Sequence, residues 1–380
     1  MKIVIAPDSY KDALSAREAA AAIAAGCARV FPQAQMIQCP MGDGGEGTLD
    51  ALLAATGAER RVAEVHDALG RPIDARWGWH AARATAYIEL AEASGLQALA
   101  DVERTALHST TFGVGELIRE ALDAGATRLI LTLGGSATND AGAGMLAALG
   151  ARLIDTEGQP LPPGGAALAQ LAELDLSGLD PRLATLMVET AVDVDNPLLG
   201  ERGASAIFGP QKGATSADVT QLDAALAHFA DHVASTLGKD HRALLGAGAA
   251  GGMGFAAAAF LEAQLKPGIE LVMDQVDFDR LLEDADLVIT GEGQLDGQSL
   301  AGKTPVGIAR RARRHGVPTL ALAGRLGAGW QAVHDEGIEA AFALADGPVT
   351  LPEALARTPE LLADRSEGLL RIWRLGRSSA

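Results

Sequence analysis

The chain has 380 residues, of which 48% are hydrophobic, 21% charged and 4% aromatic, and its formal net charge at pH 7 is −18. At roughly 150 residues per domain this length predicts two globular domains, and the apolar fraction excludes a chain that is mainly disordered. The negative charge disfavours nucleic acid or an anionic membrane surface as a partner, because their phosphate groups would be repelled. The two cysteines, Cys27 and Cys39, form no CxxC motif, which is typical of a protein in the reducing cytoplasm.

Strand and helix patterns alternate at both ends of the chain. The expected strands are residues 3–6, 35–39, 287–290, 319–323 and 340–344, and the expected helices include residues 15–30 and one that begins near Glu46. Ser15 and Glu18 have the spacing of a capping box at the start of the first helix. Apolar strands separated by helices of crossover length indicate a parallel, doubly wound sheet.

The middle of the chain has a different pattern. Its candidate strands, residues 85–90, 128–133 and 186–193, stand among long glycine-rich loops. We therefore expect an α/β protein in which residues 1–65 and 285–380 form one Rossmann-like, doubly wound parallel-sheet domain. Residues 66–284 would form a second α/β domain inserted into it. A simple division near the middle of the chain remains the alternative, because composition alone does not bring the two ends together.

Residues 244–261 contain no charged side chain and are formally long enough to be considered as a membrane span. The segment is rich in alanine and glycine, so it is weakly hydrophobic and a poor helix former. We expect a buried glycine turn that runs into a helix, and no membrane association.

Several glycine clusters carry charged or hydroxyl side chains. They are residues 42–48, 134–140, 209–213, 246–254 and 291–304. Glycine lets backbone N–H groups approach an anion closely, and a following helix N-terminus adds partial positive charge. Together the clusters predict a phosphate-binding site, although a chain with 45 glycines also places some of them in ordinary turns.

The few lysines support this prediction. Only six of the 31 basic residues are lysine, and Lys212 and Lys303 lie inside glycine clusters while Lys11 follows the first strand. A compact ammonium group is a common point charge for a transferring phosphate. Residues 297–304 also match the pattern GxxxxGK[ST]. Because the preceding strand is expected to end at Thr290, well before Gly297, we do not expect a true P-loop there.

Carboxylates follow several expected strands, namely Asp8, Asp43, Asp193 and Glu292. The carboxyl ends of parallel strands line the ligand crevice, where acids can hold Mg²⁺ or accept a proton from an attacking hydroxyl. Each of them taken singly could also be a loop cap or a solvated acid. His228 and His232 have a helical metal-ligand spacing, but neither a metalloprotease Glu nor a third ligand accompanies them.

Long motifs resemble those of one family, the bacterial glycerate 2-kinases of the glycerate kinase type-1 group. They are APDSYKDALSA at the start, GDGGEGT, TTFGVGELI, GGSATND, DVDNPLLG, FGPQKGA, GAGAAGGMG and DLVITGEGQLDGQSLAGKTPVG, and they extend along nearly the whole chain. The resemblance implies transfer of the ATP γ-phosphate to the 2-hydroxyl of D-glycerate, with Mg²⁺, in a two-domain α/β protein whose active site lies between the domains. The choice of the 2-hydroxyl over the 3-hydroxyl depends on the resemblance alone.

Combining this implication with the residue pattern, we assign expected roles. Lys11 and Lys212 would neutralise the transferring phosphate, and Asp193 would orient or deprotonate the glycerate hydroxyl. Asp43 and Glu292 would hold Mg²⁺. The expected phosphate and nucleotide ligands are Gly134, Gly135, Ser136, Asn139, Asp140 and Lys303. The sequence leaves open which acid is the base, which domain holds adenine, and whether the chain forms a homodimer.

Two other classes of protein fit the sequence less well than a kinase. A nucleotide-dependent oxidoreductase needs a glycine fingerprint after its first strand, whereas this chain has Pro7-Asp8-Ser9-Tyr10-Lys11 there. A ligand sensor without chemistry would keep the glycines but would not need acids and lysines together. Release of ADP on mixing with ATP, Mg²⁺ and glycerate distinguishes a kinase from both.

Overall fold

The computed structural model describes residues 1–378, which divide into two compact units. Unit 1 comprises residues 1–43, 50–57 and the described residues from 269 onward, and unit 2 comprises residues 44–49 and 58–268. The chain passes between them near the helices α2 (Thr48–Thr56) and α9 (Gly268–Gln275). The expected boundaries of independently folding domains, residues 1–65 with 285–380 and residues 66–284, stay a prediction.

Unit 1 contains a five-stranded sheet in the order β13-β12-β11-β1-β2, and all of its pairings are parallel. The strands are β1 (Lys2–Pro7), β2 (Gln35–Gln38), β11 (Leu287–Leu295), β12 (Thr319–Leu326) and β13 (Ile338–Ala343). Residues from the two ends of the chain are therefore neighbours, with Ile3 opposite Leu287 and Pro7 opposite Gly291. The expectation of a doubly wound parallel sheet is confirmed.

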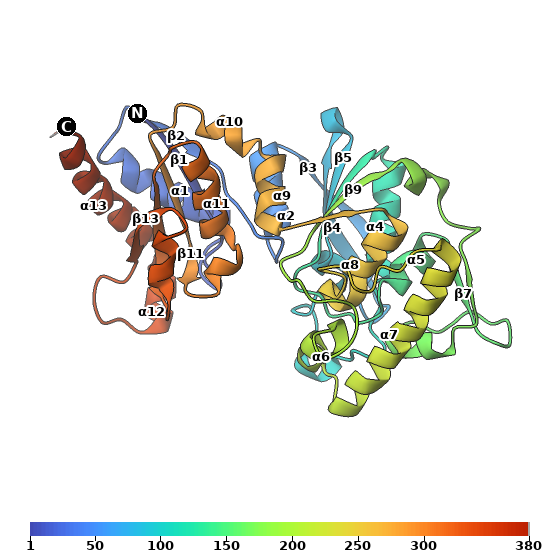
Figure 1. Ribbon diagram of the computed structural model, residues 1–380. Helices are drawn as coiled ribbons and strands as arrows, with labels where there is room; N and C mark the ends of the chain where they lie inside the picture. Colours follow the sequence, from blue (N-terminus) through green and yellow to red (C-terminus); the bar gives the residue numbers. More distant parts are fainter. Residues whose placement is uncertain (379–380) are drawn as a thin grey trace. The chain divides into compact units, whose positions relative to one another are not determined.

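Helices cover both faces of this sheet (Figure 1). They are α1 (Ala16–Ala28), α11 (Thr304–Arg314) and α13 (Thr358–Ser378), while α10 (Phe278–Leu282) packs against α11 and α12 (Leu351–Ala356) against α13. The helix α1 begins at the expected capping box, in which Ser15 and Glu18 each accept a backbone N–H of the other. One apolar cluster joins β1 to α1 and α13 through residues such as Ile5, Ile23 and Leu362. A second cluster lies between β12 and α11 and includes Val306 and Ala321.

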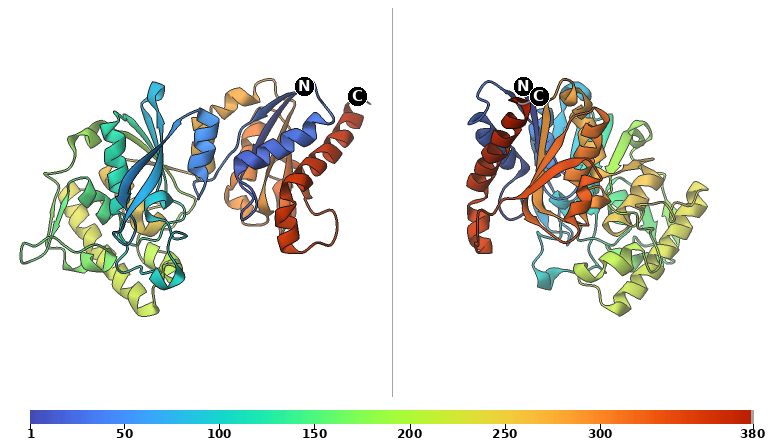
Figure 2. Two further views of the ribbon diagram at one scale, coloured as in Figure 1. Left: turned by 180° about the vertical axis from the view of Figure 1, so that it is seen from behind. Right: turned by 60° about the vertical axis from the view of Figure 1, so that its left-hand side comes forward.

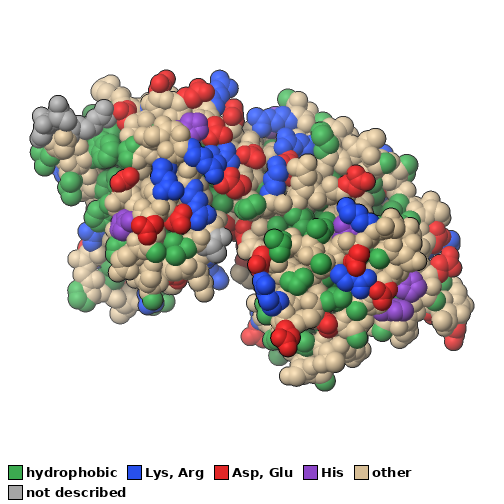
Figure 3. Space-filling view, in the orientation of Figure 1, with side chains coloured by type: hydrophobic (Ala, Val, Ile, Leu, Met, Phe, Trp, Pro, Cys, Tyr) green, Lys and Arg blue, Asp and Glu red, His purple; other side chains and the backbone are tan. Residues whose placement is uncertain are grey.

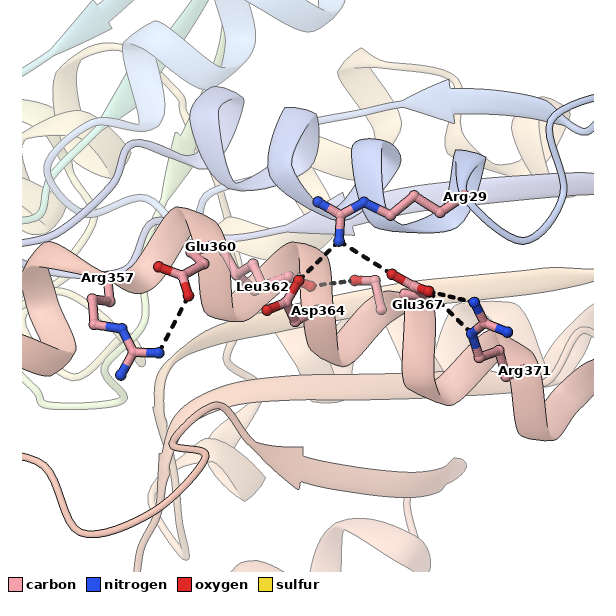
Figure 4. A network of polar contacts seen from close by, with 8 residues as sticks. Arg29, Arg357, Glu360, Leu362, Asp364, Glu367 and Arg371 are labelled. Carbon is pink, nitrogen blue, oxygen red and sulfur yellow. Dashed lines mark hydrogen bonds and ion pairs between the residues drawn. The ribbon is translucent and has the colours of Figure 1, made fainter.

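The pair α1 and α13 packs closely and is also linked by charge (Figure 4). A Cβ at Gly26 would lie 2.0 Å from the carbonyl oxygen of Ala363, so only glycine permits this approach. Arg29 of α1 donates to Asp364 and Glu367 of α13 at 2.8 and 3.1 Å. Such exposed pairs are screened by water and contribute little to stability, so apolar packing is the main force between the two helices.

Unit 2 contains a six-stranded mixed sheet in the order β10-β9-β6-β5-β4-β3. The strands are β3 (Glu59–His66), β4 (Pro72–His80), β5 (Thr85–Glu89), β6 (Arg128–Thr132), β9 (Met187–Ala191) and β10 (Gln264–Lys266). The strands β5, β6, β9 and β10 are parallel. The antiparallel hairpin of β3 and β4 was not expected from the sequence, nor was the small ribbon of β7 (Arg152–Ile154) and β8 (Glu173–Asp175).

The helices of unit 2 pack against its sheet and against one another, as the two views in Figure 2 show. They are α3 (Ala91–Ser94), α4 (Phe112–Asp123), α5 (Ala143–Ala148), α6 (Ala204–Phe208), α7 (Ser216–Leu237) and α8 (Ala249–Phe260). One buried apolar cluster extends through the unit and includes Leu117 of α4, Phe229 of α7 and Phe255 of α8. Because β5, β6 and β9 are adjacent and parallel, their carboxyl ends lie at the same edge of the sheet.

The uncharged segment 244–261 folds as the expected glycine turn and short helix. Ala250, Gly251 and Gly252 at the start of α8 all have positive φ angles, so the helix is broken there. Among the described residues no helix combines the length and the apolar character that a membrane span requires.

Charged side chains of opposite sign lie beside one another on the surface (Figure 3). In unit 1, Arg311 pairs with Glu270 and Asp279, and in unit 2, Arg242 pairs with Asp231 and Asp240. These ion pairs neutralise the arginines that take part in them. An anionic ligand is therefore expected to bind at a cation that is not already paired with a carboxylate.

Candidate active site

The loop after β6 in unit 2 is held by a buried carboxylate. Asp140 has no exposed surface and accepts hydrogen bonds from the backbone N–H and the hydroxyl of Thr111, at 2.8 and 2.9 Å. It also accepts from the N–H groups of Gly142 and Gly144, both at 3.1 Å. Burial raises the pKa of Asp140, and these hydrogen bonds oppose the rise. The side chain organises the loop from inside.

Asn139 is equally buried and also faces the interior. Its Nδ2 donates to the Ser205 hydroxyl of α6 at 2.9 Å, and its Oδ1 is buried without a hydrogen-bond partner. The structure therefore places both Asn139 and Asp140 behind the loop. Neither Thr111 nor Ser205 was singled out from the sequence, because a buried hydroxyl has no distinct local pattern.

Lys212 lies almost completely buried against the same loop. Its side chain is 1% exposed, and Nζ donates to the Ser136 hydroxyl at 2.7 Å and to the Thr138 carbonyl at 2.6 Å. Burial lowers the pKa of Lys212 to about 7, while the nearby carboxylate of Asp140 opposes this shift. An anion beside Nζ would stabilise the protonated form. The structure thus brings together Ser136 and Lys212, both predicted site residues.

Two glycines allow neighbouring segments to close on this loop. A Cβ at Gly134 would lie 2.5 Å from the Cα of Gly45, and the N–H of Gly134 donates to the Gly44 carbonyl at 3.1 Å. A Cβ at Gly251 would lie 2.0 Å from the Thr138 carbonyl oxygen, the same oxygen that Lys212 contacts. Side chains at these positions would force the backbones apart.

Asp193 follows β9 and lies next to the segment 44–49. Its Oδ1 accepts the N–H of Gly268 at 2.9 Å, and a Cβ on Gly44 would approach its Oδ2 to 3.4 Å. Since Gly44 in turn contacts Gly134, unit 2 gathers Asp193 and the phosphate-loop candidates at the carboxyl edge of its sheet. The expected position of Asp193 just after a strand is confirmed, although the strand ends at Ala191.

Glu89, at the end of β5, is a further residue of this edge that the sequence analysis did not identify. It is 3% exposed and accepts the N–H groups of Gly47 and Leu49, at 3.1 and 2.9 Å. Burial raises its pKa to about 7, and these two hydrogen bonds limit the rise. Glu89 therefore fixes the segment 44–49 on unit 2. The sequence signal that could have identified Glu89 is a glutamate at the end of an apolar strand.

Unit 1 carries a second group of acids, Asp8 directly after β1, Asp43 in the loop that follows β2, and Glu292 within β11, where the expectation that it follows the strand was wrong. Burial, together with the charge of Asp43, raises the pKa of Asp8 to about 6, and a hydrogen bond from the Thr304 hydroxyl opposes the rise. Tyr10 donates its hydroxyl to the Leu322 carbonyl at 2.7 Å. Its pKa is raised by burial and by the charges of nearby acids.

Glu292 is the most buried of the predicted metal ligands. It is 9% exposed, accepts the Ser299 hydroxyl at 2.7 Å, and has its pKa raised to about 7 by burial. Repulsion from Asp8 and Asp43 adds to the rise, while Ser299 and Lys303 oppose it. Carboxylates that repel one another in this way favour a bound cation.

The protein side chains by themselves nevertheless do not form a complete metal site. Among residues 1–378, no group of three or more His, Cys, Asp and Glu side chains is arranged to hold a metal ion. Mg²⁺ is commonly held by one or two carboxylates together with substrate phosphates and water. The acids of unit 1 fit this second mode.

The phosphate-loop pattern at residues 297–304 has a different setting from the expected one. The strand β11 extends to Leu295, because its pairing with β12 continues through Leu295 opposite Leu326. The expectation that the strand ends at Thr290 was wrong. Because the strand ends at Leu295, close to Gly297, the distance between strand and motif no longer argues against a phosphate loop at residues 297–304. Lys303 is the N-cap residue of α11. Lys11 is exposed, and its backbone N–H lies 3.4 Å from where a Cβ on Gly293 would be.

Replacing Glu292 by glutamine is expected to stabilise the protein at pH 8 but not at pH 4. The raised pKa of Glu292 means that its protonated form stabilises the fold; this contribution is complete below its usual pKa of 4.5 and is lost as pH rises through about 7. An amide keeps the Ser299 contact and does not ionise. We expect a gain on the order of 2–3 kcal/mol at pH 8, measured by urea unfolding across this pH range.

The exposed Glu339 of β13 provides the control, since Glu339→Gln removes one charge from the same sheet without removing a buried one. Equal pH dependence of stability in wild type and the Glu292→Gln variant would contradict the assignment.

The fold and these two groups of residues define a class of protein. Glycine loops at strand ends, a buried lysine and clustered acids are the parts used for transfer of a phosphoryl group between small anions, a reaction that depends on positioning and charge neutralisation. Comparison with known proteins agrees. The family model described as the glycerate kinase family matches residues 3–374.

Individual relatives match over nearly the whole chain. It is 46% identical over 380 residues to the glycerate 2-kinase of Escherichia coli K12, with all of both chains covered. It is 49% identical over 362 residues to the glycerate kinase of Bacillus subtilis 168, covering 95% of each chain. The crystal structure of a glycerate kinase 2 from Salmonella typhimurium LT2 has a TM-score of 0.91 and 46% identity, covering 100% of this chain and 99% of that one. This chain belongs to the glycerate kinase family.

Proposed function

We propose that the protein is an ATP-dependent glycerate 2-kinase, which converts D-glycerate and ATP to 2-phosphoglycerate and ADP. The observation that carries the proposal is the buried Lys212 on the glycine loop of unit 2, in a chain of the glycerate kinase family. In the reaction the glycerate 2-hydroxyl oxygen forms a bond to the γ-phosphorus. The bond from that phosphorus to the bridging oxygen breaks, and ADP leaves.

In unit 2, we assign the anion contacts to Lys212, the Ser136 hydroxyl and the backbone of Gly134 and Gly135. Lys212 supplies the positive charge that the transferring phosphoryl group requires. Asn139 and Asp140 are buried and hydrogen-bonded within unit 2, which supports a role in positioning the loop; their expected role as ligands stays a prediction.

We assign Asp193 as the group that accepts the hydroxyl proton. Its Oδ1 is occupied by the N–H of Gly268, which orients the carboxylate. Because the carboxylate follows a parallel strand at the ligand edge of the sheet, it is well placed to act as a general base.

In unit 1, we assign Asp43 and Glu292 as the groups that hold Mg²⁺, with Asp8 nearby. A bound Mg²⁺ supplies charge neutralisation on the nucleotide phosphates. Lys11 follows β1, and Lys303 is the N-cap residue of α11 and acts by its charge on Glu292; in this proposal both add positive charge for the nucleotide.

The other expectations remain proposals. We propose a cytoplasmic location, with which the two buried, unpaired thiols of Cys27 and Cys39 agree. Domain boundaries at residues 65 and 285 can be tested by limited proteolysis. Homodimer formation can be tested by sedimentation.

Alanine at Lys11 or Lys303 is expected to lower kcat/KM for ATP by about 10- to 100-fold, because each removes one charge-assisted contact to phosphate. Steady-state kinetics at saturating glycerate provides the measurement. Lys239, which is exposed in unit 2, provides the control. If both variants match Lys239→Ala, these lysines do not contact the nucleotide.

The experiment that tests the function is an ADP-release assay with ATP, Mg²⁺ and D-glycerate, followed by phosphorus NMR of the product. We expect ADP formation that depends on glycerate and is lost on chelation of Mg²⁺, and a phosphomonoester on carbon 2. A product carrying phosphate on carbon 3 would overturn the regiochemistry only. An absence of glycerate-dependent ADP release would overturn the kinase proposal.

A further inference from the structure

A segment that the sequence analysis did not single out lies beside Lys212 in unit 2. The short 3₁₀ turn Asp101–Glu103 ends at Arg104. The residue after Lys212 is Gly213, with φ of +90°, where a Cβ would lie 2.4 Å from the Arg104 carbonyl oxygen and 3.4 Å from the Arg104 Cβ. The backbone of Arg104 thus packs against the turn that carries Lys212, through a contact that only glycine allows.

The segment that carries Arg104 is fixed from the other side. Glu103 accepts a hydrogen bond from Arg71 at 2.7 Å and the N–H of Ala100 at 3.0 Å. Arg71 in turn contacts the buried carboxylate of Asp67. These contacts hold the backbone at Arg104 in place without using the Arg104 side chain.

The guanidinium group of Arg104 is incompletely paired. Its Nε is buried and has no hydrogen-bond partner, and among the arginines of unit 2 that the structure describes, no other has such a buried N–H. Its Nη2 forms an ion pair with Asp101 at 2.8 Å, and the Asp101 side chain is 85% exposed. A highly exposed carboxylate is a weak partner that a ligand can displace.

We propose that Arg104 binds the carboxylate of the 2-hydroxy acid substrate, an inference that rests on the proposed function. A guanidinium group matches the plane of a carboxylate and binds it through two N–H groups, whereas the ammonium of Lys212 suits a phosphoryl group. The carboxylate of glycerate is attached to the carbon that bears the reacting hydroxyl. The group that holds this carboxylate must therefore lie close to the phosphoryl site, and the backbone of Arg104 lies against Gly213, the residue that follows Lys212.

The buried Nε without a partner would gain one on substrate binding. The carboxylate would replace Asp101 at the guanidinium. Arg104 would then select for an acid over a neutral alcohol of the same shape, because leaving its buried Nε–H without a hydrogen-bond partner is unfavourable.

The test compares Arg104→Gln and Arg104→Lys with wild type. We expect Arg104→Gln to raise KM for D-glycerate by about 10- to 100-fold, the range of a charge-assisted hydrogen bond, with KM for ATP changed less than about twofold. Arg104→Lys should recover part of the loss, since it keeps the charge without the bidentate geometry. Wild type should prefer D-glycerate to its neutral methyl ester, and Arg104→Gln should reduce that preference.

Two variants serve as controls. Arg152→Gln removes an exposed arginine that pairs with Asp175 elsewhere in unit 2 and should leave both KM values unchanged. Asp101→Asn removes the competing carboxylate and should leave KM for glycerate unchanged or lower it a few-fold. A raised KM for ATP with an unchanged KM for glycerate would assign Arg104 to the nucleotide and overturn the inference. Unchanged values for both substrates would overturn it too, and in either case wild-type turnover would leave the kinase proposal intact.

Discussion

Replacing Lys212 by methionine is expected to lower kcat by about 10³-fold or more, the range found when a cation that neutralises a transferred phosphoryl group is removed. Methionine has a similar length and suits the buried position, so the fold should survive. The measurement is single-turnover phosphoryl transfer at saturating ATP and glycerate. A variant that folds, as judged by its melting temperature and circular dichroism, and still turns over at a near-normal rate would remove Lys212 from the site.

The pH profile provides an independent readout of Lys212. Because burial lowers its pKa to about 7, the free enzyme has a protonated side chain below pH 7 and a neutral one above it. We therefore expect kcat/KM to fall as pH rises through about 7, as it should when the protonated form is required. In Lys212→Arg this alkaline limb should move out of the measurable range, whatever the residual rate.

Replacing Asp193 by asparagine is expected to lower kcat by about 10² to 10⁴, the usual contribution of a general base, with much smaller changes in either KM. The amide still accepts the N–H of Gly268 and can hydrogen-bond the substrate hydroxyl, but it is not basic enough to take the proton. Steady-state kinetics with both substrates varied separates these effects.

Asp195, two residues further along the same loop, offers the matched control. It is exposed and pairs with Arg202, so Asp195→Asn should retain normal kinetics. If Asp193→Asn instead keeps kcat and raises KM for Mg-ATP, Asp193 binds the metal or the nucleotide. Asp43 would then be the better candidate for the base.

Some features of the structure are determined by residues that lie close together in the sequence. The strand at the N-terminus, the capping box of Ser15 and Glu18, and the strands expected at 85–90 and 128–133 follow from residues close together in sequence. The structure has all of them, with β5 and β6 each ending one residue earlier than expected. The lysines inside glycine clusters and the acids after strands were also visible as patterns. The placement of Asp8 and Asp193 after strands follows from chain connectivity in a parallel sheet.

Other features depend on contacts between distant segments, so the sequence alone did not determine them. The strand β11 continues past Glu292 because β12 offers pairing partners as far as Leu326. Burial of Lys212 requires the loop 134–140 to lie against it, and this burial lowers its pKa. Asn139 and Asp140 look like ligands in sequence, but tertiary packing turns them inward.

What the sequence by itself determined was the α/β class, the parallel sheet and the kinds of residue available for phosphoryl transfer, because strand and helix periodicities and glycine turns are local properties. Only the tertiary structure decided which of those residues touch. It added Glu89, which holds residues 44–49 through two backbone N–H groups, and Arg104, which lies against Gly213. Burial, hydrogen-bond partners and pKa values arise from segments that fold together from far apart in the chain, so no local pattern encodes them.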